Sequence, residues 1–125
     1  MKLGETLTEV NLLKANAYTE EQMTRWITEL ENYVIESVFN RAEGNDYKPV
    51  VYDYDLDLEK ELMIPDPYSE IYIYYVCSKI DYWDREMDSY NNSIAMYNAA
   101  YQNFAAYMRR TYKPKSAPNY KVRLH

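Results

Sequence analysis

The sequence predicts a mainly α-helical fold, a small helical bundle with a long C-terminal helix and a short extended or β-hairpin arm. Three observations lead to this prediction. Apolar residues recur every three or four positions over most of the chain. Residues 49–64 instead alternate between apolar or aromatic and acidic side chains. From Tyr68 to Lys113 there is neither glycine nor proline. A chain of 125 residues suits one domain that buries roughly two thirds of its unfolded surface.

Two helices are expected in the N-terminal part. The second should span about residues 20–39, because Thr19 and Gln22 form a capping box and acidic residues follow at the positive helix end. Its buried stripe is Met23, Trp26, Ile27, Leu30, Val34 and Val38. The short amphipathic helix before it carries Leu3, Leu7, Val10 and Leu13 at helical spacing.

The arm is predicted over residues 45–64. Period-two alternation with aromatic and β-branched residues is typical of a strand, here with one acidic face. The acidic row lacks the glycine and the final glutamate that a calcium loop requires, which favours a solvated strand face. Since an isolated hairpin is marginal in water, we expect it to lean on a partner.

The C-terminal helix is predicted over residues 67–112, after the start signal IPDPY, in which Asp66 can cap and Pro67 suits the first helical position. Its apolar stripe keeps phase through DSYNNS, so a bend near 88–92 is the largest break expected. Such a helix would be about 69 Å long, against a diameter of about 35 Å for a compact domain of this size. Either the chain folds back at DSYNNS or another molecule covers the stripe. Trp26 and Trp83, both on apolar stripes, should be mostly buried.

Charge is segregated along the chain. Residues 1–108 hold 8 Lys/Arg and 20 Asp/Glu, a net charge of −12, whereas residues 109–125 carry +6 and no acid. We therefore divide the chain into one domain, 1–112, and a basic tail, 113–125, that docks on nucleic acid or on the acidic face of another copy. The candidate subunit interface consists of Tyr52, Tyr54, Leu56, Leu58, Asp53, Asp55, Asp57, Lys113, Lys115, Lys121 and Arg123.

No catalytic constellation is visible, and we predict neither an enzyme nor a bound cofactor or metal. His125 is the only histidine and Cys77 the only cysteine, expected to be a small buried hydrophobe. The glycines, Gly4 and Gly44, form no phosphate-binding loop. No window approaches the roughly 18 apolar residues of a membrane span, so a soluble protein of the cytoplasm is expected.

Residues 62–114, LMIPDPYSEIYIYYVCSKIDYWDREMDSYNNSIAMYNAAYQNFAAYMRRTYKP, are similar to small head–tail connector (adaptor or head-completion) proteins of tailed bacteriophages and prophages. The features that carry this resemblance are IPDPY before a Tyr-rich helix, the block YNNS…AMYNAAYQNFA and the Tyr-Lys-Pro exit. TLTEVNLLKANAYTEEQMTRWITELE resembles the family's opening helices, whereas residues 40–61 match poorly.

The resemblance implies a structural virion protein that forms a homo-oligomeric ring beneath the portal protein and receives a stopper or tail-completion protein. Double-stranded DNA would pass through transiently, and an acidic body would limit its adsorption. Such a protein would lie in the host cytoplasm during assembly and then at the head–tail junction of the virion. The alternative is a small acidic phage-borne inhibitor that mimics DNA, which should lack a basic tail.

Overall fold

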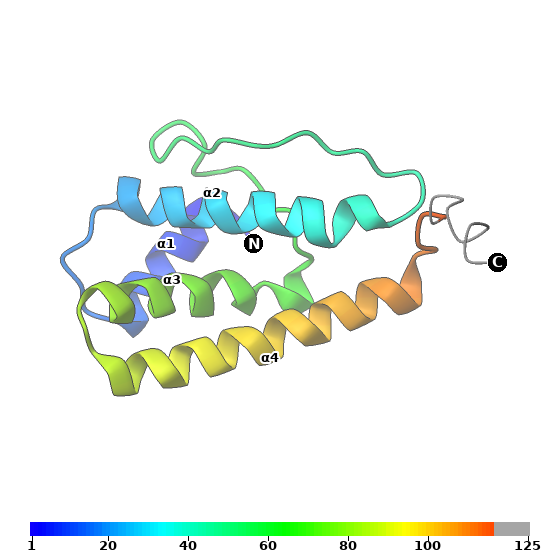
Figure 1. Ribbon diagram of the computed structural model, residues 1–125. Helices are drawn as coiled ribbons and strands as arrows, with labels where there is room; N and C mark the ends of the chain where they lie inside the picture. The colour runs from blue at the N-terminus through cyan, green and yellow to red at the C-terminus, as the bar shows by residue number, and fades with distance from the viewer. Residues whose placement is uncertain (117–125) are drawn as a thin grey trace.

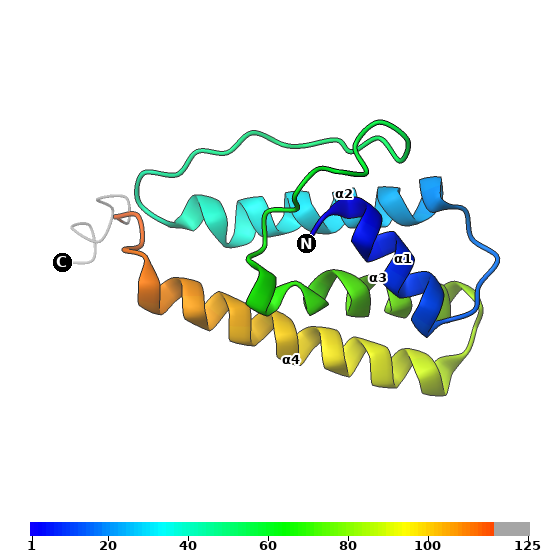
Figure 2. The same cartoon turned by 180° about the vertical axis from the view of Figure 1, so that it is seen from behind.

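The computed structural model describes residues 1–116 and confirms that the protein is mainly helical (Figure 1). Four α-helices, α1 (Leu3–Leu13), α2 (Glu20–Ser37), α3 (Glu70–Trp83) and α4 (Met87–Thr111), are joined by the short 3₁₀ helices η1 (Phe39–Arg41) and η2 (Asp66–Tyr68). Helices α2, α3 and α4 lie side by side, and α1 crosses α2 and α3 on one face, as the view from behind shows (Figure 2). Within the described residues there is no β-strand.

The first two helices form where the sequence predicts them. Thr19 Oγ1 accepts a hydrogen bond from the Gln22 amide at 3.0 Å and caps α2. The whole predicted stripe of α2 is buried, including Trp26, which is 5% exposed. On α1 the stripe ends one residue early, because Leu13 is 66% exposed while Leu3, Leu7 and Val10 are buried.

The predicted single helix over 67–112 is wrong, since the chain reverses at residues 84–86 and forms two separate helices, α3 and α4. A Schellman motif ends α3. The Arg85 amide donates to the Tyr82 carbonyl at 3.1 Å and the Glu86 amide to the Asp81 carbonyl at 2.9 Å, with Arg85 in the left-handed region at φ 60°. Glycine usually occupies that position, so with Arg85 there no residue marks the end of the helix. Trp83 and Met87, the members of the predicted stripe on either side of the reversal, are both exposed, so the buried face is interrupted there.

Residues 88–93, DSYNNS, are helical, but they form the first turns of a separate helix, α4, so the predicted continuity with the preceding helix is wrong. Helix α4, at 25 residues, is about 37 Å long and packs antiparallel to α3. Its aromatic stripe is covered in part by the same chain. Tyr97 packs on Tyr75 of α3 with ring centroids 5.3 Å apart, and Tyr101 packs on Tyr33 of α2 at 5.8 Å. Helix length is therefore no argument for a second molecule.

The start of α3 also differs from the prediction. Residues 66–68 form η2, and Asp66 makes no capping hydrogen bond. Its carboxylate instead accepts a hydrogen bond from the amino group of Met1. The contact ties the first residue of the chain to the entrance of α3, and α3 itself begins at Glu70.

The predicted hairpin arm is absent, because residues 45–64 form irregular chain with turns at 54–56 and 58–59, and the one β-pairing in this segment is the isolated bridge of Glu61 with Lys2. The chain runs along α2 and returns across the start of α1 (Figures 1 and 2). Two asparagines replace the missing strand. Asn40 accepts from the Tyr47 amide at 2.8 Å and donates to the Tyr47 carbonyl at 3.0 Å. Asn32 bonds in the same way to both backbone groups of Val50, at 2.8 and 2.9 Å. The backbone groups that a neighbouring strand would have bonded are thus bonded by the side chains of Asn32 and Asn40.

The returning end of the arm caps α1. The first amides of a helix have no partner within the helix. The Leu3 amide donates to the Lys60 carbonyl at 3.0 Å, and the Gly4 amide to the Leu58 carbonyl at 2.8 Å. A Cβ on Gly4 would lie 3.0 Å from the Leu58 carbonyl oxygen, so glycine permits this close approach.

Candidate assembly surfaces

Residues 53–61, which we call the acidic loop, close on themselves in a tight turn. Asp53 Oδ1 accepts hydrogen bonds from the amides of Asp55 and Leu56, at 2.8 and 2.9 Å. The Asp57 carboxylate accepts from the Asp53 amide at 2.8 Å, and the Asp57 amide donates to the Asp53 carbonyl at 3.0 Å. The two amide donors lower the pKa of Asp53. Side-chain caps of this kind hold the turn in one conformation.

The turn presents apolar side chains to solvent. Leu56, at its tip, is 82% exposed, and the nearby Val51 and Tyr54 are 84% and 43% exposed. Asp55 beside Leu56 is also exposed, and Asp57 is half-buried. Among the described residues, the only ion pairs along this loop are those of Glu59 with Lys2 and of Glu61 with the Met1 amino group. None of the three aspartates forms an ion pair with another residue of the described part of the chain.

Two predicted interface residues turn inward instead. Leu58 is half-buried and packs on the core beside Gly4. The Tyr52 hydroxyl donates to Glu31 Oε2 at 2.7 Å. The structure thus brings Tyr54, Leu56, Asp53, Asp55 and Asp57 together at one surface and removes Tyr52 and Leu58 from it.

Of the predicted cations, Lys113 and Lys115 lie at the opposite end of α2. The Lys113 carbonyl accepts from the Glu43 amide at 2.7 Å, and the Lys115 amide donates to the Arg41 carbonyl at 2.9 Å. The start of the tail is therefore paired with residues 41–43 of its own chain, and Lys113 Nζ lies 3.6 Å from a carboxylate oxygen of Glu43. Lys121 and Arg123 lie outside the described residues.

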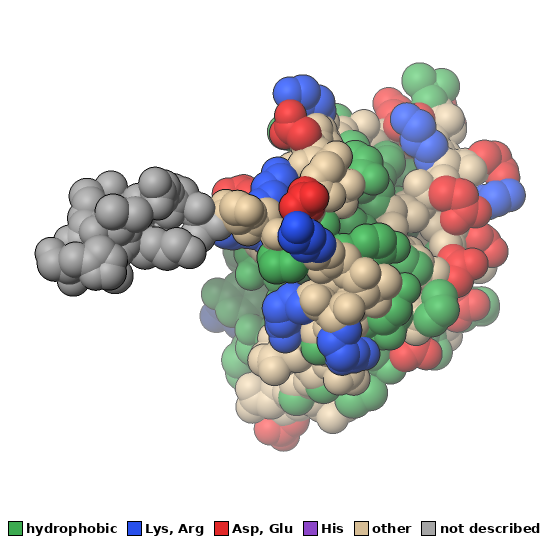
Figure 3. Space-filling model, turned by 90° about the vertical axis from the view of Figure 1, so that its right-hand side faces the viewer, with side chains coloured by type: hydrophobic (Ala, Val, Ile, Leu, Met, Phe, Trp, Pro, Cys, Tyr) green, Lys and Arg blue, Asp and Glu red, His purple; other side chains and the backbone are tan. Residues whose placement is uncertain are grey.

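Lys and Arg side chains gather around apolar side chains at this end of the molecule (Figure 3). We call it the basic end and define it by Arg41, Arg109, Arg110, Lys113 and Lys115. Arg109 and Arg110 occupy the last turn of α4, where cations stabilise a helix. Over residues 1–116, neither these two nor Arg41 forms an ion pair.

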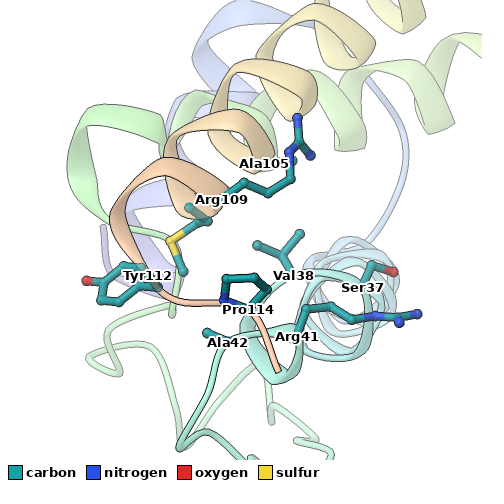
Figure 4. Close-up of a pocket in the computed structure, with 9 residues that line it drawn as sticks. Ser37, Val38, Arg41, Ala42, Ala105, Arg109, Tyr112 and Pro114 are labelled. Atoms are coloured by element: carbon teal, nitrogen blue, oxygen red, sulfur yellow. The ribbon is translucent and has the colours of Figure 1, made fainter. Parts of the chain in front are cut away.

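A pocket of about 170 Å³ opens between η1 and the end of α4 (Figure 4). Apolar groups form most of its wall, from Val38, Ala42, Ala105, Met108, Tyr112 and Pro114. Arg41 of η1 and Arg109 of α4 also line the pocket, so two cationic side chains border its apolar wall. Sequence reasoning missed this pocket, because residues 37–42 and 105–114 meet only through the fold.

A buried carboxylate lies at the centre of the bundle. Glu31 is fully buried and accepts hydrogen bonds from Tyr52, from the Met63 amide at 2.9 Å and from the Tyr72 hydroxyl. Burial and the neighbouring carboxylate raise the pKa of Tyr72 and of Tyr52. The sequence held one signal for this site, since Glu31 falls on the apolar face of α2 four residues after Ile27.

A second buried acid, Asp81, fixes the α3–α4 corner. It is 2% exposed, accepts from Lys14 Nζ at 2.7 Å and from Ser93 Oγ at 2.7 Å, and so joins the end of α1 to α3 and α4. Both buried acids have complete sets of donors, which makes them structural anchors.

Large apolar side chains are exposed at the same corner. Tyr82, Trp83 and Met87 are 49%, 60% and 47% exposed, so the prediction that Trp83 is buried is wrong. Trp83 is the last residue of α3, and the reversal carries it past the end of the core. Its ring packs edge-on against Tyr82 at 5.3 Å.

No family model, curated protein or solved structure matches this chain. In the described part of the chain no helix is both long and apolar enough to cross a membrane. Over the same residues, no three His, Cys, Asp or Glu side chains cluster in a way that could hold a metal ion.

Proposed function

We propose that this protein is a structural virion component, a head–tail connector that forms a ring beneath the portal and joins the DNA-filled head to the tail or stopper. The observation that carries the proposal is the placement of two complementary surfaces at opposite ends of one helical unit. The acidic loop lies beside the first half of α2, where Tyr52 and Asp53 neighbour Thr24 and Thr28. The basic end lies beyond the last turn of α2.

Such an arrangement suits repeated contacts between identical copies. Two different patches that recognise each other make a heterologous contact, which closes into a ring when the rotation between copies permits it. The exposed Leu56, Tyr54 and Val51 supply apolar area, and charge supplies orientation. The resemblance of residues 62–114 to connector proteins also supports the proposal of a ring-forming connector.

The ring would also need surfaces for its neighbours along the channel. The apolar corner of Tyr82, Trp83 and Met87 has the aromatic and methionine content that is enriched in protein interfaces. We assign this corner to the portal or to the stopper. A net charge of −6 over the whole chain favours weak adsorption of the DNA that passes.

Assembly with the portal protein of the same phage or prophage tests the proposal. We expect multi-angle light scattering of the mixture to give one complex with several copies of this chain per portal, and electron microscopy to show an added ring. A mixture that elutes as separate portal and monomer would contradict it. Binding to a DNA-processing enzyme in competition with duplex DNA would instead support the DNA-mimic alternative.

The variant Trp83→Asp addresses the assignment of the apolar corner. It should weaken binding to the portal or stopper while leaving self-association unchanged. Tyr33→Asp, at a tyrosine of similar exposure (54%) on α2 and outside both proposed surfaces, shows whether any exposed aromatic has this effect.

A further inference from the structure

We propose that Leu56 of one copy inserts into the pocket between Arg41 and Arg109 of the next copy, with Asp55 facing Arg109 and Asp57 facing Arg41. This inference rests on the proposed ring and identifies the contact that would build it.

The size of the pocket favours a single side chain. At about 170 Å³ it is smaller than the roughly 300–1,000 Å³ of sites for small molecules. Its walls are apolar and its border is cationic, so the matching occupant is an apolar side chain flanked by carboxylates. Within the described residues, Leu56 has that environment, between Asp55 and Asp57 at the tip of a turn.

The turn is already formed before any contact. Four hydrogen bonds between Asp53 and residues 55–57 fix the backbone that carries Leu56, so little conformational entropy is lost on docking. Burial of the exposed Leu56 side chain in such a contact would be worth about 1.5–3 kcal/mol.

Geometry excludes the pairing within one chain. The acidic loop and the pocket lie at opposite ends of α2, whose 18 residues span about 27 Å. The loop of one copy must therefore reach the pocket of another.

Disulfide trapping tests the contact directly. The variant Leu56→Cys/Arg41→Cys, in a Cys77→Ala background, should form a ladder of covalent multimers under mild oxidation. Each single-cysteine variant can form dimers at most, so multimers beyond the dimer require both positions. Absence of the ladder under conditions where the wild-type chain assembles, alone or on the portal, would overturn the inference and leave the proposed function standing. A chain that assembles under neither condition would refute both.

Matched substitutions measure the strength of the contact by sedimentation. Leu56→Asp should weaken association by about ten- to a hundredfold, the loss expected for one buried leucine. Leu12→Asp, at a leucine that is 76% exposed, should have no effect.

Charge reversal tests the orientation. Arg109→Glu should weaken association, whereas Arg110→Glu, in the same helical turn but outside the pocket, should change it much less. Asp55→Lys combined with Arg109→Glu should restore assembly. Failure of the pair to rescue would contradict the assigned facing of charges. Retention of duplex DNA that depends on Arg41 and Arg109, without any covalent ladder, would assign the basic end to nucleic acid.

Discussion

The Tyr72 hydroxyl donates a hydrogen bond to Glu31 Oε1 at the centre of the bundle, where both side chains are fully buried. The same hydroxyl accepts from the Ile64 amide at 2.9 Å, so one oxygen connects α2, α3 and the end of the arm. A carboxylate with no cation beside it depends on such donors for its stability in the core.

Tyr72→Phe removes one of the three donors to Glu31 and a backbone acceptor. We expect the free energy of unfolding to fall by about 1.5–3 kcal/mol, the range for hydrogen bonds to charged groups. Urea denaturation measures this change. Tyr74→Phe is the control on the same helix, since its hydroxyl makes an exposed bond to Glu70 and its loss should change stability by less than about 0.5 kcal/mol.

High pH should destabilise the protein through the same tyrosine. Burial and Glu31 raise the pKa of Tyr72, so above the ordinary tyrosine value near 10 the unfolded chain releases a proton that the folded chain retains. Stability is thus complete below about pH 10 and falls above it, by about 1.4 kcal/mol per pH unit for this group. Denaturation curves between pH 8 and 11 should show a shallower decline for Tyr72→Phe than for the wild type. Equal slopes would mean that Tyr72 ionises in the folded protein as readily as in the unfolded chain.

The two tryptophans should differ sharply in their effect on stability. Trp26→Ala should cost about 3–5 kcal/mol, as expected for truncation of a large core residue. Trp83→Ala should cost less than about 1 kcal/mol in the isolated chain, because that ring is 60% exposed. Fluorescence offers a second measurement, since the remaining tryptophan should emit at longer wavelength in Trp26→Phe than in Trp83→Phe.

Arg85 should be replaceable by glycine with a gain in stability. The left-handed conformation costs a residue with a Cβ roughly 1 kcal/mol, and glycine avoids this cost. We expect Arg85→Gly to raise the melting temperature by a few degrees, and Arg85→Val to lower it. A lower melting temperature for the glycine variant would show that the Arg85 side chain itself holds the corner.

The pair of the half-buried Lys14 and the buried Asp81 should be costly to break from the lysine side. Lys14→Met leaves Asp81 buried with only Ser93 as a side-chain donor, and a loss of about 3–5 kcal/mol is typical of a buried charge without its partner. Lys14→Met/Asp81→Leu should recover much of that loss. A double-mutant cycle measured by denaturation separates the coupling of the pair from the separate effects.

Sequence patterns predicted α1 and α2 well because local signals agree there, with the Thr19 cap before an uninterrupted apolar stripe. The helical conformation of residues 88–93 was predictable from the apolar spacing despite residues with low helix propensity, but their continuity with the preceding helix was wrongly predicted. The reversal at residues 84–86 was not predictable, because an arginine occupies the left-handed position where glycine usually marks the end of a helix.

The candidate surfaces were predictable only in part. The alternation of acidic residues correctly indicated that Asp53 and Asp55 are exposed. It could not show that hydrogen bonds to the Asp53 side chain fold residues 53–57 into a turn. Glu31 was detectable as an acid on an apolar face, whereas its tyrosine donors lie 21 and 41 residues away in the chain. The pocket at the basic end forms where the end of α4 packs near η1, and no local sequence pattern predicts that these two segments lie together.

The asparagine clamps on Tyr47 and Val50 also determine how the molecule opens. Residues 46–56 make almost no backbone–backbone hydrogen bonds, so the stretch is fastened to α2 at separate points and not along a continuous ladder. Segments held in this way can detach as a unit while the helices stay folded. The amides of Val51 and Tyr54 should therefore exchange their hydrogens with solvent far sooner than those of α3. A protease acting on the native protein should make its first cut in this segment.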